Sequence, residues 1–229
     1  MKLILERFKN FLQEVNLSQL ALFHAKDSDV HTLVFYNMSS DISNPSVVAA
    51  IEIAKTQQSC IPVTYQVEWV FTKEEYRGKG LGETLYGISF YLTNSAKAGL
   101  TSDQNTGTST AAGRRWAKLV KDKKTVARKT PGIPPKGGHS EFDYGKIGSK
   151  KTPDDPLDDC GLDGKAPGGD GINQSLMLKN YNKYADDYKN GRKNHEEFMK
   201  KIPKNERKEF ENDLEQIAFE EFSIAYDGD

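Results

Sequence analysis

Hydrophobic residues recur at two different spacings in the first part of this 229-residue chain. Spacings of three and four residues predict an amphipathic helix over residues 3–15. Alternating apolar and polar residues predict strands over Ala21–Ala25 and Thr32–Tyr36, which a short polar turn would join into a hairpin, and over Val47–Ala54. The chain is therefore expected to open with a helix that packs on strands downstream.

The clearest alternation lies in Val63–Thr72. One face of this expected strand is fully apolar, with Val63, Tyr65, Val67, Trp69 and Phe71, and the other carries Thr64, Gln66, Glu68, Val70 and Thr72. A polar link and a glycine-rich turn follow. Helical spacing then resumes in a buried stripe of Leu81, Leu85, Ile88 and Leu92. The pattern predicts a strand, loop and helix in succession.

Further elements complete a first domain over residues 1–120. Ala98–Ser102 is expected to be a short strand, and Ser109–Val120 a helix with Trp116 and Leu119 directed inward. Strands flanked by helices predict an α/β fold with a mixed, mostly antiparallel sheet.

The rest of the chain differs in composition. Residues 121–171 begin with a basic run and become rich in proline and glycine, which predicts a long loop or linker. Residues 172–229 are expected to form a helical subdomain, with helical periodicity first in Leu178, Tyr181, Tyr184 and Tyr188 and then, after Pro203, in Phe210, Leu214, Ile217 and Phe222.

Composition restricts the environment more than the function. Charged residues make up 28% of the chain, yet the net charge of -1 indicates no class of partner. Cys60 and Cys160 lack the paired spacing of zinc ribbons or disulfide frameworks, which favours a reducing cytoplasm. Charged residues interrupt the apolar N-terminus, and no apolar stretch is long enough for a bilayer, so we expect a cytoplasmic protein without a membrane partner.

The sharpest local motif is Tyr76–Gly82, which reads YRGKGLG between the alternating strand and the helix. Its glycines allow a tight turn and close approach to a ligand, and free amides at the start of a helix attract an anion such as a pyrophosphate. A Walker motif would require Lys and then Ser or Thr after the last glycine, but Glu83 and Thr84 follow Gly82. A dinucleotide fingerprint would require a glycine where Glu83 stands.

The motif resembles the signature of the GNAT family of N-acyltransferases, in which Arg or Gln is followed after two residues by Gly and then, after one more, by Gly or Ala. Arg77, Gly80 and Gly82 fill these positions. The resemblance extends upstream through Trp69–Tyr76, similar to the family's apolar strand end and acidic link, and downstream to Gly99–Asp103, similar to its next strand.

The resemblance implies acetyl-coenzyme A, or a related acyl-CoA, as acyl donor. In this family the strand before the loop splays from its neighbour, and the exposed backbone pairs with the pantetheine arm of the coenzyme; Val70, Phe71 and Thr72 occupy these positions. The loop amides take the pyrophosphate, which assigns Arg77, Gly78, Lys79, Gly80, Leu81 and Gly82 to coenzyme binding.

The resemblance also suggests a catalytic residue. Many family members place a glutamate on this strand as general base toward the amine, near the position of Glu68. The alternative is an ordinary solvated carboxylate on a strand face.

The second helix departs from the family pattern. The family often has a tyrosine there as general acid, but Trp116 stands at that position and its indole cannot replace the phenol. Tyr86, Ser102 and Asp103 are conceivable substitutes, although structural roles are favoured for them. Two functions therefore remain open: an N-acyltransferase that moves an acyl group to an amine, and an inactive binding or structural module of the same type.

A third hypothesis is a nucleic-acid-associated protein that uses the basic run in residues 114–129. A solvated basic helix end is favoured over it, because Trp116 alone interleaves the cations and falls on the inward stripe. The aspartates around Cys160 lack the spacing of an EF-hand, and the four histidines are scattered, so no metal site is expected.

Overall fold

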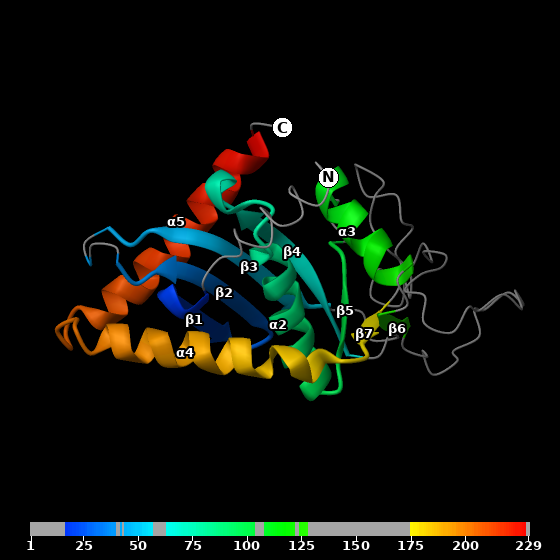
Figure 1. Cartoon of the computed structure of the whole chain (residues 1–229), viewed down its shortest axis with the longest axis horizontal. Coiled ribbons are helices and arrows are strands. Elements are labelled where there is room, and N and C mark those ends of the chain that lie inside the picture. Colours follow the sequence, from blue (N-terminus) through cyan, green and yellow to red (C-terminus); the bar gives the residue numbers. More distant parts are fainter. Residues whose placement is uncertain are drawn as a thin grey trace, which may run out of the picture. The chain divides into compact units, whose positions relative to one another are not determined.

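The computed structural model describes residues 17–39, 42, 44–56, 63–103, 108–121, 124–127 and 175–227. The expected N-terminal helix and both cysteines lie outside these residues. The described chain forms a seven-stranded sheet in the order β1-β2-β3-β4-β5-β7-β6 with helices beside it (Figure 1). The predicted class, a mixed and mostly antiparallel sheet flanked by helices with a helical C-terminal region, is confirmed.

The N-terminal hairpin forms as predicted. After the short helix η1 (Leu17–Gln19), strands β1 (Leu20–Asp27) and β2 (Val30–Asn37) pair antiparallel from one end to the other. Ser28 in the turn has a φ of 48°, a left-handed conformation that is uncommon outside turns. Strand β3 (Val47–Lys55) confirms the third expected strand.

The central strand, loop and helix also form. Strand β4 (Thr64–Thr72) is followed by η2 (Glu74–Tyr76), α2 (Leu81–Ser95) and β5 (Gly99–Thr101). Strand β5 runs parallel to β4, as a helical crossover allows. The expected stripe on α2 is buried except at its last position, Leu92, which is half-exposed.

Helix α3 (Thr110–Lys121) confirms the helix expected after β5. The Ser109 hydroxyl accepts a hydrogen bond from the amide of Ala112 at 3.3 Å, as an N-cap does. Trp116 and Leu119 point inward as predicted; Trp116 is 1% exposed and packs edge-on against Phe90 of α2.

Two short strands differ from the sequence prediction. Strand β6 (Thr125–Ala127) lies inside the range expected to be a loop, and β7 (Leu176–Leu178) includes Leu178, which helical periodicity had assigned to a helix. They pair antiparallel, and Leu176 also pairs with Leu100 of β5. A three-residue apolar strand shows no period, so partners far along the chain decide its conformation. Residues 128–174 lie outside the described part.

The C-terminal region is helical as predicted from residue 181 onward. It contains η3 (Tyr181–Tyr184), α4 (Ala185–Met199) and α5 (Arg207–Asp227). Tyr184 is buried, and its ring lies against Gly87 of α2, where no side chain would fit.

Strand β4 contains one residue more than the matching part of β3. The amide of Thr56 bonds to the carbonyl of Thr64 at 2.8 Å, and the amide of Lys73 bonds to the carbonyl of Val48 at 2.9 Å. Between these bonds β3 advances eight residues, from Val48 to Thr56, whereas β4 advances nine. One extra residue in an antiparallel pair is a β-bulge.

Burial along β4 locates this irregularity. Thr64 and Gln66 are buried at the start of the strand, but from Val67 onward the buried residues are the odd-numbered ones, through Trp69 and Phe71. The expectation of a single apolar face is therefore correct only for the second half of β4. The change of phase places the bulge near Val67.

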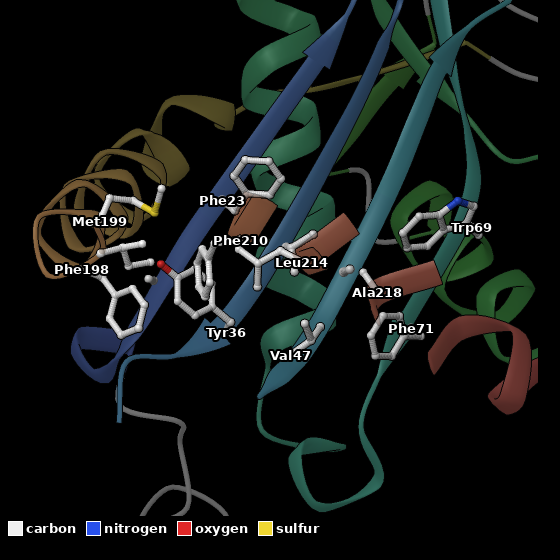
Figure 2. Packing of buried hydrophobic residues seen from close by; sticks show 14 residues of the cluster. Phe23, Tyr36, Val47, Trp69, Phe71, Phe198, Met199, Phe210, Leu214 and Ala218 are labelled. Carbon is white, nitrogen blue, oxygen red and sulfur yellow. The ribbon is translucent and has the colours of Figure 1, made fainter. Parts of the chain in front are cut away.

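The chain divides into two compact units, and the first comprises residues 1–52, 69–88 and 183–229. Its core joins the hairpin, β3 and the end of β4 to the C-terminal helices (Figure 2). Tyr36 makes edge-to-face contacts with Phe198 and Phe210, at centroid distances of 5.4 and 5.7 Å. The buried cluster consists of Ala21, Phe23, Val34, Tyr36, Val47, Ala50, Trp69, Phe71, Phe198, Met199, Ile202, Phe210, Leu214 and Ala218.

Two tyrosine–histidine hydrogen bonds join α4 to the hairpin. In the first the hairpin supplies the histidine and α4 the tyrosine, and in the second these roles are exchanged. His24 of β1 bonds through Nδ1 to the Tyr188 hydroxyl at 2.8 Å, and Tyr36 of β2 bonds to Nδ1 of His195 at 3.0 Å. His195 Nε2 lies 3.2 Å from a carboxylate oxygen of Glu211. Because a carboxylate only accepts, Nε2 of the neutral ring donates to Glu211, and the tyrosine donates to Nδ1.

Burial keeps these histidines neutral. It lowers the pKa of His24 to about 4, and neighbouring positive charge from His31, Arg192 and Lys26 adds to the effect. Burial also lowers the pKa of His31, whose Nδ1 lies 2.9 Å from Nε2 of His24. It lowers the pKa of His195 too, against the opposing effect of Glu211. A charged imidazolium at these positions would lose its hydration, and the surrounding groups would not stabilise the charge as well as water does.

The second unit comprises residues 53–68 and 89–182. Its described part has a notably polar interior. The hydroxyls of Thr64 and Ser175 bond to each other at 2.7 Å, and the Thr125 hydroxyl donates to the carbonyl of Leu119 at 3.1 Å. These bonds satisfy groups that would be costly to bury alone. None of the described helices is long and apolar enough to cross a bilayer.

We predict that Gly191→Ala destabilises the protein, although alanine in a helix is normally favoured over glycine by about 1 kcal/mol. A Cβ at Gly191 would lie 2.6 Å from Cβ of Leu22, an atom fixed to the β1 backbone, so α4 must shift away from the strand. We expect a loss of about 1–3 kcal/mol in the free energy of unfolding, measured in urea. Asn190→Ala, at the exposed neighbouring position, is the control and should cost nothing; an equal or smaller loss at Gly191 would contradict this packing.

We also predict that the free energy of unfolding falls as the pH drops from about 6.5 toward 4. The pKa of His24 is lower in the folded protein, so the unfolded chain binds more protons in this interval and acid favours unfolding. The shift from 6.5 to about 4 corresponds to a loss of about 3 kcal/mol across the interval. Urea unfolding of wild type and His24→Gln at a series of pH values measures it. The variant should lose less stability than wild type, and parallel curves would refute the assignment.

Candidate functional site

The glycine-rich loop after β4 lies at the surface of the first unit. Gly78 and Gly80 have φ values of 75° and 87°, in the left-handed region that favours glycine. Both are exposed, and a Cβ built on either would meet no heavy atom within 4 Å. The loop backbone therefore faces open space, so a ligand could approach it closely.

Helix α2 begins where this loop ends. The amides of Leu81 and Gly82 precede the first intrahelical acceptor, so the helix itself cannot satisfy them. Thr84 closes the loop, because both its amide and its hydroxyl donate to the carbonyl of Gly80, at 2.9 and 3.3 Å. The arrangement directs free donors and the positive end of a helix dipole to the surface beside two exposed glycines.

The loop contains two cations, and each makes a local contact. Arg77 donates from Nε to the carbonyl of Thr72 at 3.2 Å, which ties the loop back to the end of β4. The ammonium of Lys79 lies 5.3 Å from the centroid of the Tyr76 ring, within cation–π range. The remaining guanidinium nitrogens of Arg77 are not used by this bond, so its charge stays available beside the loop.

The outer edge of β4 carries a second set of backbone donors and acceptors. Pairing with β5 ends at Gln66 and Thr101, while β4 continues to Thr72. Because the amide of Lys73 points to β3, alternation directs the backbone groups of Val70 and Thr72 to the opposite side. In the described register, no residue of β5 is paired with Val70.

Phe71 differs from its two neighbours. Its amide and carbonyl point to β3, and its ring lies in the core with Trp69 (Figure 2). Trp69 stacks on Phe222 of α5 at a centroid distance of 5.5 Å, and Lys73 forms an ion pair of 2.8 Å with Glu221 of the same helix. Side chains therefore anchor the end of β4 on α5, and its outward backbone is left facing away from β3.

The candidate base Glu68 lies on the same strand, two residues before Val70, and belongs to the second unit. Its side chain is half-exposed, and its Oε1 accepts a hydrogen bond of 2.7 Å from Nε2 of Gln66. The three conceivable substitutes for a general acid, Tyr86, Ser102 and Asp103, are all buried.

The structure brings Val70, Thr72 and the loop Arg77–Gly82 together in one unit, whereas Trp116 is packed in the interior of the other. Two features of the site had no sequence signal. The bulge in β4 is hidden because apolar and polar residues alternate regularly through it, and the bond from Arg77 to Thr72 depends on the path of the loop. Among the described residues, no group of three or more His, Cys, Asp or Glu side chains could hold a metal ion.

Comparison with known proteins does not assign the chain to a family. The chain matches no protein-family model, no curated protein and no solved structure.

We predict opposite effects of alanine at two glycines of the loop. Gly80→Ala should lower the free energy of unfolding by about 1 kcal/mol, because its φ of 87° strains any residue with a Cβ although the space is open. Gly82→Ala lies within α2, and its Cβ would contact Oγ1 of Thr72 at an ordinary 3.7 Å, so it should be neutral or stabilising. Thermal unfolding of both variants tests this, and equal losses would mean that the turn is not the one described.

Proposed function

We propose that this chain is an acyl-CoA-dependent N-acyltransferase of the GNAT type, which moves an acetyl or similar group to a primary amine by direct attack. The observation that carries the proposal is the glycine loop, whose exposed backbone precedes the free amides of α2. The outward backbone of Val70 and the outward amide of Thr72, whose carbonyl accepts a bond from Arg77, lie beyond the last pair with β5 and support it. A diphosphate and an extended amide-containing arm are a chemical match for these two sets of groups.

Different residues would bind the two parts of the coenzyme. The amides of Leu81 and Gly82 would hold a diphosphate, with Arg77 and Lys79 as the nearest cations. The backbone of Val70 would pair with the amides of a pantetheine arm, in the way that a further strand adds to a sheet edge. Bound acetyl-CoA would supply a thioester, at which an amine forms a C–N bond while the C–S bond breaks and the thiol leaves.

Glu68 is the proposed general base. It would take the proton of the ammonium acceptor, so that the neutral amine attacks, and the Gln66 amide holds its carboxylate in place. Positioning of the amine near the thioester would supply much of the remaining acceleration. A cytoplasmic location belongs to the same proposal and rests on the cysteine pattern.

The second candidate is an inactive module that binds the coenzyme without turnover. One specific observation favours it: Trp116, at the position expected of the general acid, is 1% exposed and packed against Phe90. Such a side chain serves the interior and does no proton transfer. The two functions share the coenzyme site and differ only in turnover.

We predict that acetyl-CoA stabilises the protein, because a ligand that binds only the folded state at 100 times its dissociation constant adds about 2.7 kcal/mol. The melting temperature, measured with and without coenzyme, reports this. Gly80→Val should abolish the increase, since a branched side chain would occupy the space in front of the loop, while Gly82→Ala should retain most of it. Absence of any increase in the wild type at millimolar coenzyme would exclude both candidates.

We predict that release of free thiol, measured with acetyl-CoA and a panel of amines, distinguishes the active acyltransferase from the inactive module. An active enzyme releases thiol, and Glu68→Gln should slow release about 100-fold or more while leaving the coenzyme-induced stabilisation unchanged. An inactive module shows stabilisation without release on any amine. Full activity of Glu68→Gln would remove Glu68 from the proposal but not the coenzyme site.

A further inference from the structure

Charge is unevenly distributed in the second unit. In its described residues, which lie within 53–68 and 89–182, there are eight cations and only two carboxylates, Glu68 and Asp103. The eight cations are Lys55, Lys97, Arg114, Arg115, Lys118, Lys121, Lys124 and Lys179. The net charge of the whole chain is -1, so this positive charge is a local property.

Helix α3 carries three of these cations on one exposed stripe. Arg114, Lys118 and Lys121 are spaced by four and three residues, which places them on the same side of the helix, and all three are exposed. The opposite side, with Trp116 and Leu119, is buried.

Two lysines adjoin the C-terminal end of this stripe. The amide of Lys179 donates to the carbonyl of Lys124 at 3.0 Å, and the adjacent Thr125 hydroxyl bonds to the carbonyl of Leu119 in α3. We call the exposed residues Arg114, Lys118, Lys121, Lys124 and Lys179 the basic face.

The basic face has no charge compensation within the described residues. None of its five cations forms an ion pair there, and α3 contains no acidic residue. Cations at these spacings repel one another and disfavour the helix, and the helix dipole offsets this only in the last turn, where Lys118 and Lys121 lie. Arg114 lies outside that turn. Within the described residues, this repulsion has a stability cost that a bound polyanion would remove.

We propose that the basic face binds the phosphate backbone of a nucleic acid duplex. The other exposed residues of α3 are small, Ala111 and Ala117 among them, and the described part of α3 exposes no large apolar side chain. Val126 of β6 is exposed beside Lys124, but it is a single aliphatic side chain at the end of the basic face. Protein partners usually require aromatic or aliphatic anchors at the centre of an interface, and unpaired bases require aromatic rings for stacking. A duplex backbone needs only the cations, and its charges are regular and dense. Binding is then independent of base sequence.

The test uses the whole chain and a labelled DNA duplex of about 20 base pairs, with affinity measured between about 50 and 200 mM salt. The variant that combines Arg114→Gln, Lys118→Gln and Lys121→Gln should bind more than tenfold more weakly at the lowest salt. The slope of log K against log salt should become shallower by about 3, since each phosphate contact contributes about 0.9. If the triple variant does not fold, Arg114→Gln alone should reduce the slope by about 1.

A matched control removes three exposed cations from the other unit, two in α4 and one at its C-cap: Lys189→Gln, Lys193→Gln and Lys200→Gln. It changes net charge equally and should retain wild-type affinity and slope. Equal loss in both variants would reduce the effect to net charge and overturn the proposal. So would absence of binding by the wild type at the lowest salt. Binding to polyglutamate as tight as binding to the duplex would overturn it in favour of an acidic protein partner.

The inference is independent of the acyltransferase proposal. The basic-face variant should keep the full acetyl-CoA-induced rise in melting temperature, while Gly80→Val should keep its affinity for the duplex. Either result can therefore fail without affecting the other.

Discussion

The alternation of backbone hydrogen bonds along a strand constrains the candidate site more than any side chain does. A strand directs successive amides to opposite sides, so the bond from Lys73 to Val48 also decides that Val70 and Thr72 face away from β3. Without the extra residue in β4, the bond from the Thr56 amide to the Thr64 carbonyl would fix the opposite alternation along β4, and Phe71 would direct its backbone groups away from β3 instead. The bulge therefore selects which groups a ligand could meet.

Core packing in the first unit keeps this arrangement in place. Trp69 stacks on Phe222, and Lys73 forms an ion pair with Glu221. These side-chain contacts with α5 fix the position of the end of β4. Helix α4 approaches β1 so closely that Gly191 lies against Leu22, and buried neutral histidines join the same helix to the hairpin. The glycine loop thus extends from a strand that is fixed by its core side chains, which is how a flexible turn can present its amides in a defined direction.

The sequence predicted the long periodic elements and the loop between β4 and α2, because their signals are local. Alternation in Val63–Thr72 and the glycines of Tyr76–Gly82 need no knowledge of distant residues. The features that the sequence did not predict all depend on pairing between residues far apart in the chain. Strands β6 and β7 are too short to show a period, and Leu178 fits a helix or a strand until Val126 and Leu100 are known to lie beside its strand. The bulge is invisible for a related reason, since regular alternation continues through it in the sequence while its pairing with β3 shifts.

The histidines illustrate the same limit for chemistry. In sequence His24, His31 and His195 are scattered, and nothing local distinguishes a neutral buried imidazole from a solvated one. In the fold each bonds to a partner, and burial outweighs the nearby carboxylate even at His195, which lies beside Glu211 and still has a lowered pKa. Desolvation decides here because Glu211 is partly exposed, and solvent screens its attraction for the imidazolium. His24 and His195 therefore act as uncharged hydrogen-bonding links between α4 and the hairpin, and His31 extends the first of these links within the hairpin. A charge on any of the three would oppose the burial that lowers its pKa, so a function that required charged imidazoles would weaken this part of the fold.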